Sequence, residues 1–237
     1  MDIGNIKIKI FADGADKDRM LEMYRRSWIR GFTTNPTLMK KAGVKDYEAF
    51  AREIIGAIPD RPISFEVFSD DFAEMERQAL KITGWGDNVY VKIPVTNTLG
   101  QSSYPLIKRL AGAGVKQNVT AIMTLEQVKA VSQALANGPS SYISVFAGRI
   151  ADTGRDPIPL MTEAVELLRQ YPRQELIWAS PRELLNIIQA ESIGCHIITM
   201  TNDILNKLGN LHKDLNEFSL ETVKMFYDDA VKAEFIL

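Results

Sequence analysis

The chain has 237 residues, of which 46% are hydrophobic and 24% are charged, with a formal net charge of −2 at pH 7. This balance predicts one globular domain, residues 1–237, with a sizeable core, and it excludes a disordered or fibrous chain. Because no run of Lys or Arg stands out, nothing indicates a nucleic-acid partner.

Strand-like and helix-like segments alternate about eight times along the chain. Alternating or β-branched residues predict the strands, and apolar residues at spacings of three and four predict the helices. The expected strands are 6–13, 31–36, 62–68, 88–95, 115–122, 142–149, 175–180 and 196–201. The expected helices are 16–26, 46–58, one capped by 69–71, 102–113, 124–136, 157–170, 181–191, 203–208 and an extra helix in 219–237.

This alternation predicts an α/β fold, a closed parallel (β/α)8 TIM barrel with an extra C-terminal helix. An open doubly wound sheet is the alternative, but no glycine-rich nucleotide loop follows the first strand, which ends at Asp13 and Gly14. The C-terminal segment carries Val223, Phe226 and Tyr227 on a helical period. We expect its apolar face to be buried in its own barrel or in a neighbouring subunit.

The cellular setting is indicated by what the sequence lacks. Cys195 is the only cysteine, which rules out an internal disulfide framework and indicates a reducing compartment. No window approaches the roughly 20 apolar residues of a membrane span, and residues 1–5 begin no basic region followed by an apolar run. We therefore expect a cytoplasmic protein without a membrane partner. Neither His196 nor His212 stands in a metal or triad spacing, so no metal site is expected.

Lys92 is a single cation inside the apolar run 88–95. Because strand side chains alternate between two faces, Val91 and Ile93 point one way while Tyr90 and Lys92 point the other. A lysine enclosed on that face loses hydration, which favours its neutral amine, a nucleophile that condenses with a ketone to give an imine. The alternatives are a lysine that extends to solvent or pairs with a buried carboxylate.

Most of the other predicted strands also end in polar residues. In parallel barrels the reacting groups lie at the carboxyl ends of several strands, so we expect these side chains to share one site with Lys92. Any one of them could instead cap a helix, form a turn or satisfy a backbone group. Two arginines that follow the sixth and seventh strands would suit a phosphate clamp, with surface ion pairing as the alternative. The set comprises Asp13, Asn35, Glu66, Asn118, Thr120, Ser144, Ser180, Arg149 and Arg182.

Five motifs resemble successive signatures of the transaldolase family. They are Thr33-Thr34-Asn35-Pro36-Thr37-Leu38, Val91-Lys92-Ile93-Pro94, Asn118-Val119-Thr120, Gly148-Arg149-Ile150 and Ala179-Ser180-Pro181-Arg182. Their order and spacing cover essentially the whole chain. The length is similar to that of the short transaldolases and fructose-6-phosphate aldolases, which are class I aldolase barrels. The resemblance therefore implies a homo-oligomer, since members are often ring-shaped decamers held partly by the C-terminal helix.

The resemblance also implies roles for the site residues. Lys92 would form the Schiff base with a ketose phosphate and hold a dihydroxyacetone unit after carbon–carbon cleavage. Asp13 would exchange a proton with the C4 hydroxyl, and a proton-shuttling water would be held by Glu66 with Thr120. The hydroxyls and the imine would be bound by Asn35, Asn118, Ser144 and Ser180, and the phosphate by Arg149 and Arg182. Since the protonated imine is the electron sink, neither a metal nor an organic cofactor is expected.

Two positions separate the subfamilies. Transaldolases resemble this chain in having Glu66 and Phe146, whereas fructose-6-phosphate aldolases carry Gln and Tyr there. We therefore favour transfer of dihydroxyacetone from sedoheptulose 7-phosphate or fructose 6-phosphate to an aldose phosphate, as in the pentose phosphate pathway. The alternatives are an aldolase that releases free dihydroxyacetone and a non-catalytic sugar-phosphate-binding barrel, which would not need Lys92.

Four residues in or near the expected pocket depart from the family pattern. Ala12 precedes Asp13 where an aliphatic residue is frequent, and Val145 replaces a common proline. Trp178 and Pro181 flank Ala179-Ser180 where smaller and aromatic residues are usual. Strand parity places Trp178 on the face of Ser180, which predicts that its ring narrows the substrate pocket.

Overall fold

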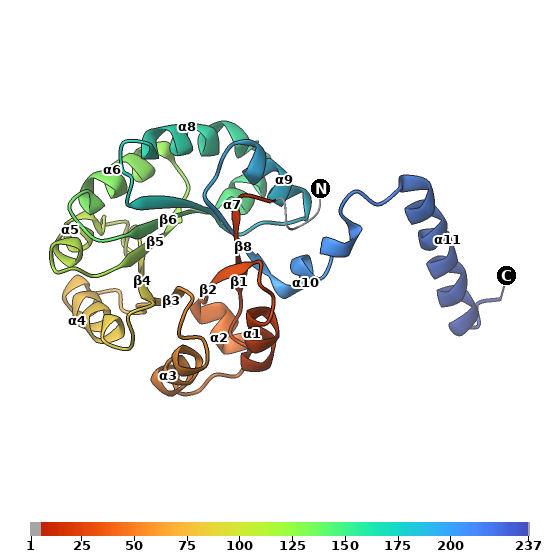
Figure 1. Cartoon of the computed structure of the whole chain (residues 1–237), viewed down its shortest axis with the longest axis horizontal. Helices are drawn as coiled ribbons and strands as arrows, with labels where there is room; N and C mark the ends of the chain where they lie inside the picture. The colour runs from red at the N-terminus through yellow and green to blue at the C-terminus, as the bar shows by residue number, and fades with distance from the viewer. Residues whose placement is uncertain (1–5, 237) are drawn as a thin grey trace.

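The computed structural model describes residues 6–236, and its centre is a closed barrel of eight parallel strands in sequence order (Figure 1). The strands are β1 (Lys9–Asp13), β2 (Ile29–Thr33), β3 (Ile63–Glu66), β4 (Val89–Pro94), β5 (Gln117–Ile122), β6 (Ser141–Val145), β7 (Gln174–Trp178) and β8 (Ile197–Thr201). The predicted α/β barrel is therefore confirmed.

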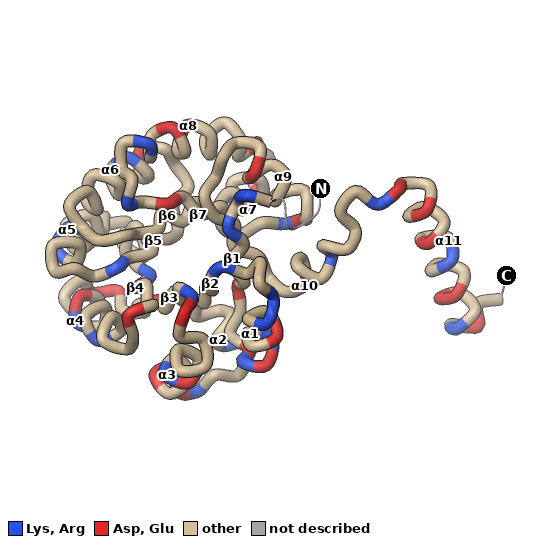
Figure 2. The backbone as a smooth tube through the Cα atoms, viewed as in Figure 1, with Lys and Arg blue, Asp and Glu red and all other residues tan. Residues whose placement is uncertain are grey.

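Helices surround the barrel as an outer ring (Figure 1). They are α1 (Lys17–Tyr24), α2 (Pro36–Lys41), α3 (Tyr47–Ala57), α4 (Phe72–Thr83), α5 (Tyr104–Gly112), α6 (Leu125–Leu135), α7 (Ala147–Ala151), α8 (Ile158–Leu168), α9 (Leu185–Ser192) and α10 (Asn202–Leu205). A 3-10 turn at Leu208–Asn210 leads to the last helix, α11 (Leu215–Lys232). Charges of both signs are spread over these helices, in keeping with the small net charge (Figure 2).

Two short helices stand where the sequence predicted the ends of strands. Asn35 caps α2 by accepting the backbone N–H of Leu38 at 2.9 Å, and Pro36 occupies the first turn, where its missing N–H costs little. The sixth strand ends at Val145 rather than at residue 149, because the chain turns at Phe146 into α7. Arg149 therefore lies on a helix.

The barrel residues divide between two layers. Outward residues such as Phe32, Phe65 and Val91 pack in the large core beneath the helices. Inward residues form a second cluster that includes Phe11, Tyr90, Tyr142, Ile177 and Ile197. The rings of Tyr90 and Tyr142 stack with centroids 4.1 Å apart, and Phe11 meets Tyr142 edge-on at 5.7 Å. Since Phe11, Tyr90 and Tyr142 each precede a predicted site residue by two positions, this aromatic layer supports the site from below.

The prediction that Trp178 narrows the pocket is wrong. Its side chain is fully buried in the outer core with Leu176, whereas Ile177 and Ala179 belong to the inner cluster. The parity argument failed because Ser180 does not continue the strand. Its φ is +60°, a left-handed conformation in which the side chains no longer alternate as they do along a strand.

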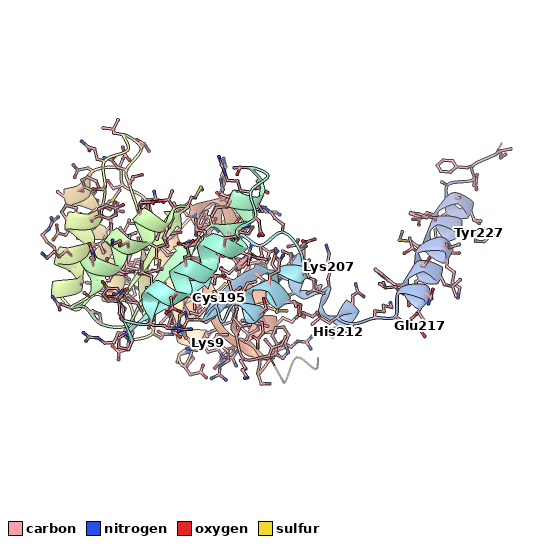
Figure 3. All side chains as sticks on the ribbon, turned by 90° about the horizontal axis from the view of Figure 1, so that it is seen from above. Lys9, Cys195, Lys207, His212, Glu217 and Tyr227 are labelled. Atoms are coloured by element: carbon pink, nitrogen blue, oxygen red, sulfur yellow. The ribbon has the colours of Figure 1, made fainter. Side chains whose placement is uncertain are left out.

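The C-terminal helix α11 begins earlier and ends earlier than the predicted range 219–237. Asp214 caps it by accepting the backbone N–H groups of Asn216 and Glu217, which places its start at Leu215. The helix stands apart from the barrel and has no buried residue (Figures 1 and 3). Its apolar side chains are largely exposed; for example, Phe226 is 63% exposed and Tyr227 is 70% exposed. The described chain therefore does not cover this face.

Two expectations concern the ends of the chain and the membrane. Residues 1–5, on which the expectation about an N-terminal leader rests, lie outside the described residues, as does residue 237. Across residues 6–236, no helix combines the length and the apolar character that a membrane crossing requires.

Candidate active site

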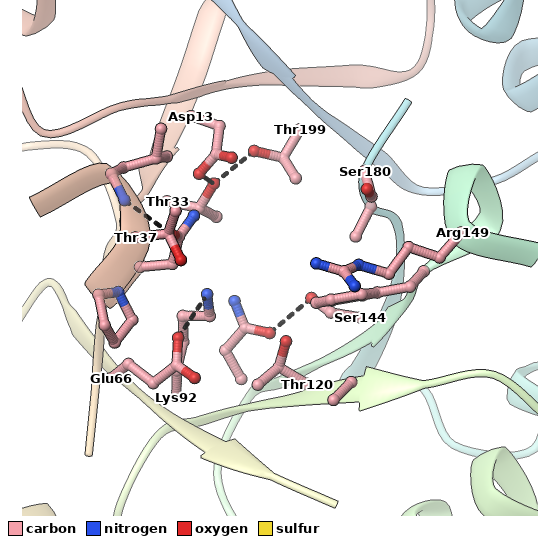
Figure 4. A pocket seen from close by; sticks show the side chains of 17 residues that line it. Asp13, Thr33, Thr37, Glu66, Lys92, Thr120, Ser144, Arg149, Ser180 and Thr199 are labelled. Carbon is pink, nitrogen blue, oxygen red and sulfur yellow. Dashed lines mark hydrogen bonds and ion pairs between the residues drawn. The ribbon is translucent and has the colours of Figure 1, made fainter. Parts of the chain in front are cut away.

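A cavity of about 460 Å³ lies where the carboxyl ends of the strands meet. All but one of the predicted site residues line it. These are Asp13, Asn35, Glu66, Lys92, Asn118, Thr120, Ser144, Phe146, Arg149 and Ser180. Figure 4 shows their side chains converging from most of the strands around the barrel. Thr33, Thr37 and Thr199 also line the cavity. The sequence analysis named the first two only within a motif and gave none of the three a role.

Lys92 lies on the inner face of β4 with only 6% of its surface exposed. Its Nζ donates to the carbonyl oxygen of Thr34 at 2.8 Å and lies 3.0 Å from Glu66 Oε2. The pairing follows from the strand register, which places Glu66 of β3 directly beside Lys92. Lys92 therefore does pair with a carboxylate, but both groups face the cavity. A carboxylate at this distance can accept the proton that an ammonium must lose before it acts as a nucleophile.

Asp13 lies at the end of β1 and is held by a hydroxyl. Its Oδ1 accepts a hydrogen bond from Thr33 Oγ1 at 2.7 Å. Burial raises the pKa of Asp13 above its ordinary value; the Lys92 charge and the Thr33 bond oppose this effect, and the Glu66 charge adds to it. A carboxylate with a raised pKa is a stronger base, which suits a group that takes a proton from a substrate hydroxyl.

A chain of hydrogen-bonded, buried polar groups includes two residues of the cavity wall, Asn118 and Ser144. Asn118 donates through Nδ2 to Ser64 Oγ at 3.0 Å and accepts from Ser144 Oγ at 2.7 Å. Thr120 Oγ1 is buried but has no hydrogen-bond partner among residues 6–236. Because buried polar atoms are rarely left unpaired, this hydroxyl marks a place for a water or a substrate group. Ser64 was missed, although it shares the inner parity of Glu66.

One alanine and one serine at the cavity have strained backbones. Ala121 and Ser180 have φ angles of +62° and +60°, in the left-handed region that non-glycine residues seldom adopt. Ala121 lies where the pairing of β5 with β6 becomes irregular. Both residues line the cavity, and such strain is typical of positions that shape a functional site.

The two predicted phosphate-binding arginines differ in placement. Arg149 lines the cavity, and its guanidinium lies 5.6 Å from the ring centroid of Phe146. Arg182 is not among the lining residues, because its guanidinium forms a two-point pair with Asp152, with Nε 2.9 Å from Oδ1. Hydrogen bonds from Arg182 hold the pKa of Asp152 below its usual range. In this structure only Arg149 faces the site.

The closed parallel barrel, with its polar cavity at the carboxyl ends of the strands, defines an enzyme-type α/β barrel. A family model described as "Transaldolase/Fructose-6-phosphate aldolase" matches residues 10–237. The chain belongs to this family and is therefore an enzyme of the aldolase or transferase type.

Individual relatives agree with the family match. A protein named "Probable transaldolase" from Dehalococcoides mccartyi is 33% identical over 202 residues, which cover 85% of this chain and 90% of that protein. A protein with the same name from Nitrosopumilus maritimus is 31% identical over 229 residues, which cover 96% and 97% of the two chains.

Two solved structures share the fold at low sequence identity. The structure of 2,3-dimethylmalate lyase has a TM-score of 0.56 at 10% identity, and the match covers 98% of this chain and 86% of that one. QR15, an aldolase, has a TM-score of 0.55 at 12% identity and covers 87% and 97%. These similarities concern the barrel alone.

Proposed function

We propose that this protein is a transaldolase that transfers a dihydroxyacetone unit from a ketose phosphate to an aldose phosphate through a Schiff base on Lys92. The observation that supports this most strongly is the buried Lys92 amine, which faces the cavity 3.0 Å from Glu66. The proposed donors are sedoheptulose 7-phosphate and fructose 6-phosphate, which the enzyme would use in the cytoplasm as part of the pentose phosphate pathway.

In the first step the neutral amine of Lys92 attacks the donor's C2 carbonyl, and the resulting carbinolamine loses its oxygen as water. Both stages need a group that moves protons between nitrogen and oxygen. A water held between Glu66 and the unpaired hydroxyl of Thr120 would serve, and it would give that buried hydroxyl its missing partner. The product is a protonated imine.

In the second step Asp13 takes the proton of the C4 hydroxyl, and the C3–C4 bond breaks. The electron pair of that bond moves toward the iminium, which becomes an enamine, and the aldehyde fragment leaves. The acceptor aldehyde then adds by the reverse sequence, with Asp13 returning the proton. No metal or organic cofactor has a part in these steps. The dihydroxyacetone unit would be held by Asn35, Asn118, Ser144 and Ser180, which line the cavity.

The two arginines are expected to contribute unequally to phosphate binding. Arg149→Ala should raise KM for fructose 6-phosphate about 10- to 100-fold, because it removes a charged hydrogen-bond donor from the cavity wall. Arg182→Ala should raise KM less than about fivefold, because its guanidinium is already paired with the exposed Asp152. Steady-state kinetics with fructose 6-phosphate and with unphosphorylated fructose would separate the phosphate effect. A larger effect from Arg182→Ala, or equal effects on both sugars, would contradict this assignment.

The choice between transferase and aldolase rests on Phe146. With fructose 6-phosphate and an aldose phosphate acceptor, the protein should form the transfer product in excess over free dihydroxyacetone. Phe146→Tyr should shift this ratio toward free dihydroxyacetone, because a tyrosine hydroxyl can bind the water that protonates the enamine. Phe146→Leu, which adds no hydroxyl, is the control and should not gain release. An unchanged product ratio in Phe146→Tyr would remove the reason for preferring the transferase.

We also propose that α11 packs on a neighbouring copy in a homo-oligomer, with a ring of ten subunits as the specific expectation. The support is its uncovered apolar face, which monomeric proteins rarely expose to this extent. Light scattering should give an oligomer mass for the full chain and a lower mass for Phe226→Asp. Lys224→Asp, on the same helix but without an apolar side chain, is the control. A monomer mass for the full chain would contradict the proposal.

A further inference from the structure

Thr199 is a cavity residue for which the proposed chemistry has no role. It lies on β8 with 6% of its surface exposed, and its Oγ1 is 2.5 Å from Thr33 Oγ1. Thr33 is 3% exposed, and its Oγ1 in turn lies 2.7 Å from Asp13 Oδ1. Strand β1 runs between β2 and β8, so the two threonines approach Asp13 from its two neighbouring strands. Figure 4 shows the three side chains as one connected row.

The direction of the hydrogen bonds follows from counting hydrogens. An ionised Asp13 carboxylate can only accept, so the single hydroxyl hydrogen of Thr33 points to Asp13. The Thr33 oxygen then has no hydrogen left and must accept in its contact with Thr199. Thr199 is therefore the donor, and the bonds run from Thr199 to Thr33 to Asp13.

We propose that Thr199 is a positioning residue for proton transfer at Asp13, acting only through the hydroxyl of Thr33. Its hydrogen bond keeps the Thr33 hydroxyl turned toward Asp13, and a hydroxyl that accepts one bond donates a stronger one. A stronger bond to the carboxylate favours the ionised form, which is the form that acts as the base. This inference rests on the proposed role of Asp13 in the transaldolase reaction.

The other charges that face Asp13 are Lys92 from β4 and Glu66 from β3. Within residues 6–236, neither side chain is hydrogen-bonded to Thr199, so we expect both to keep their places when the Thr199 hydroxyl is removed. A change in the acid limb of the pH–rate profile would then report the bond from Thr199 to Thr33. The expected direction of the shift follows from the Thr33 bond. A weaker bond from Thr33 to Asp13 stabilises the ionised carboxylate less, so the acid limb moves to higher pH.

The experiment measures the pH dependence of kcat and of kcat/KM for donor turnover in the full-length protein. Thr199→Val should move the acid limb up by about half a pH unit, with little change in KM. On that limb, kcat at a given pH should therefore fall by up to about threefold. Thr199→Ser should restore the wild-type profile. Thr33→Val should give a larger shift, and Thr33→Val with Thr199→Val should match Thr33→Val alone, because Thr199 acts only through Thr33.

Three results would overturn the proposal: a wild-type pH profile in Thr199→Val, no restoration by Thr199→Ser, or additive effects in the double variant. If valine is not accommodated and thermal unfolding shows a misfolded protein, Thr199→Ala and Thr199→Ser provide the same comparison. Borohydride trapping on Lys92 distinguishes a failure of the role of Thr199 from a failure of the proposed transaldolase function. A trapped wild type with an unchanged Thr199→Val profile overturns the role of Thr199 alone, whereas a wild type without adduct or turnover overturns the proposed function as well.

Discussion

Lys92→Arg is expected to lower the turnover of fructose 6-phosphate by about 10⁴-fold or more, the size of loss seen when a covalent nucleophile is removed. Arginine keeps a positive charge that can pair with Glu66, but it does not form an imine because the guanidinium stays protonated. The variant therefore separates the charge of Lys92 from its chemistry. The measurement is kcat for transfer, with thermal unfolding to show that the barrel is intact.

Lys92→Met is the matched variant, because it keeps an unbranched side chain of nearly the same length and removes the charge. It should be as inactive as Lys92→Arg and should leave Glu66 without its partner, at a cost to stability that the arginine variant avoids. If Lys92→Arg retained more than a few per cent of the wild-type turnover, Lys92 would be an electrostatic or structural residue and the imine mechanism would be wrong.

Gly148→Ala is expected to give the largest loss of stability among the changes considered. A Cβ at this position would lie 1.6 Å from the carbonyl oxygen of Ser180 and 2.7 Å from its carbonyl carbon. These are backbone atoms, so relief requires moving the strained turn at Ser180 or the helix α7. We expect a loss of about 3 kcal/mol in the free energy of unfolding, which corresponds to about 6–12 °C in Tm.

The same substitution should also weaken phosphate binding, because Arg149 and Ser180 sit on the two segments that must separate. Gly56→Ala in α3 is the control: nothing lies within 4 Å of its added Cβ, and alanine favours a helix over glycine by about 0.8–1.0 kcal/mol. Calorimetry of the two variants should therefore show opposite changes. Equal Tm values for Gly148→Ala and the wild type would contradict this prediction and would show that the backbone at Ser180 moves away from the added Cβ at little cost.

The barrel could be predicted from the sequence because its signals are repeated and local. Each strand is a short β-branched run, each is followed by a helical period, and parity within β3, β4 and β5 put Glu66, Lys92, Asn118 and Thr120 on one inner face. The same reasoning could have found Thr33, which alternates with the outward Phe32 on β2, and Thr199, which shares the inner parity of Ile197 on β8.

The sequence predictions failed where the backbone departs from strand geometry, or where a tertiary contact determines the orientation of a side chain. Ser180 adopts a left-handed φ, so its side chain does not follow the alternation of the strand. Extending that alternation from Ser180 back to Trp178 placed Trp178 on the wrong face. The pairing of Arg182 with Asp152 joins α7 to a loop distant in sequence, and no local pattern predicts it. Asn35 and Phe146 directly precede the short helices α2 and α7. The strand-like sequence pattern continues into both helices, so it did not show where the strands end.

The start of α11 could have been found from its sequence. Asp214 is followed three residues later by Glu217, and an acidic residue in that position is typical of the first turn of a helix. What covers its apolar face could not be found in this way, because no element of residues 6–236 buries it.

Borohydride trapping with fructose 6-phosphate, followed by peptide mass mapping, tests the role of Lys92 most directly, because reduction fixes an imine on the residue that formed it. We expect one adduct of the mass of a dihydroxyacetone unit, on the peptide that contains Lys92, and none in Lys92→Arg. An adduct on another lysine, or a folded protein that binds the sugar phosphate without any adduct, would contradict the Schiff-base mechanism and favour a non-catalytic sugar-phosphate-binding barrel.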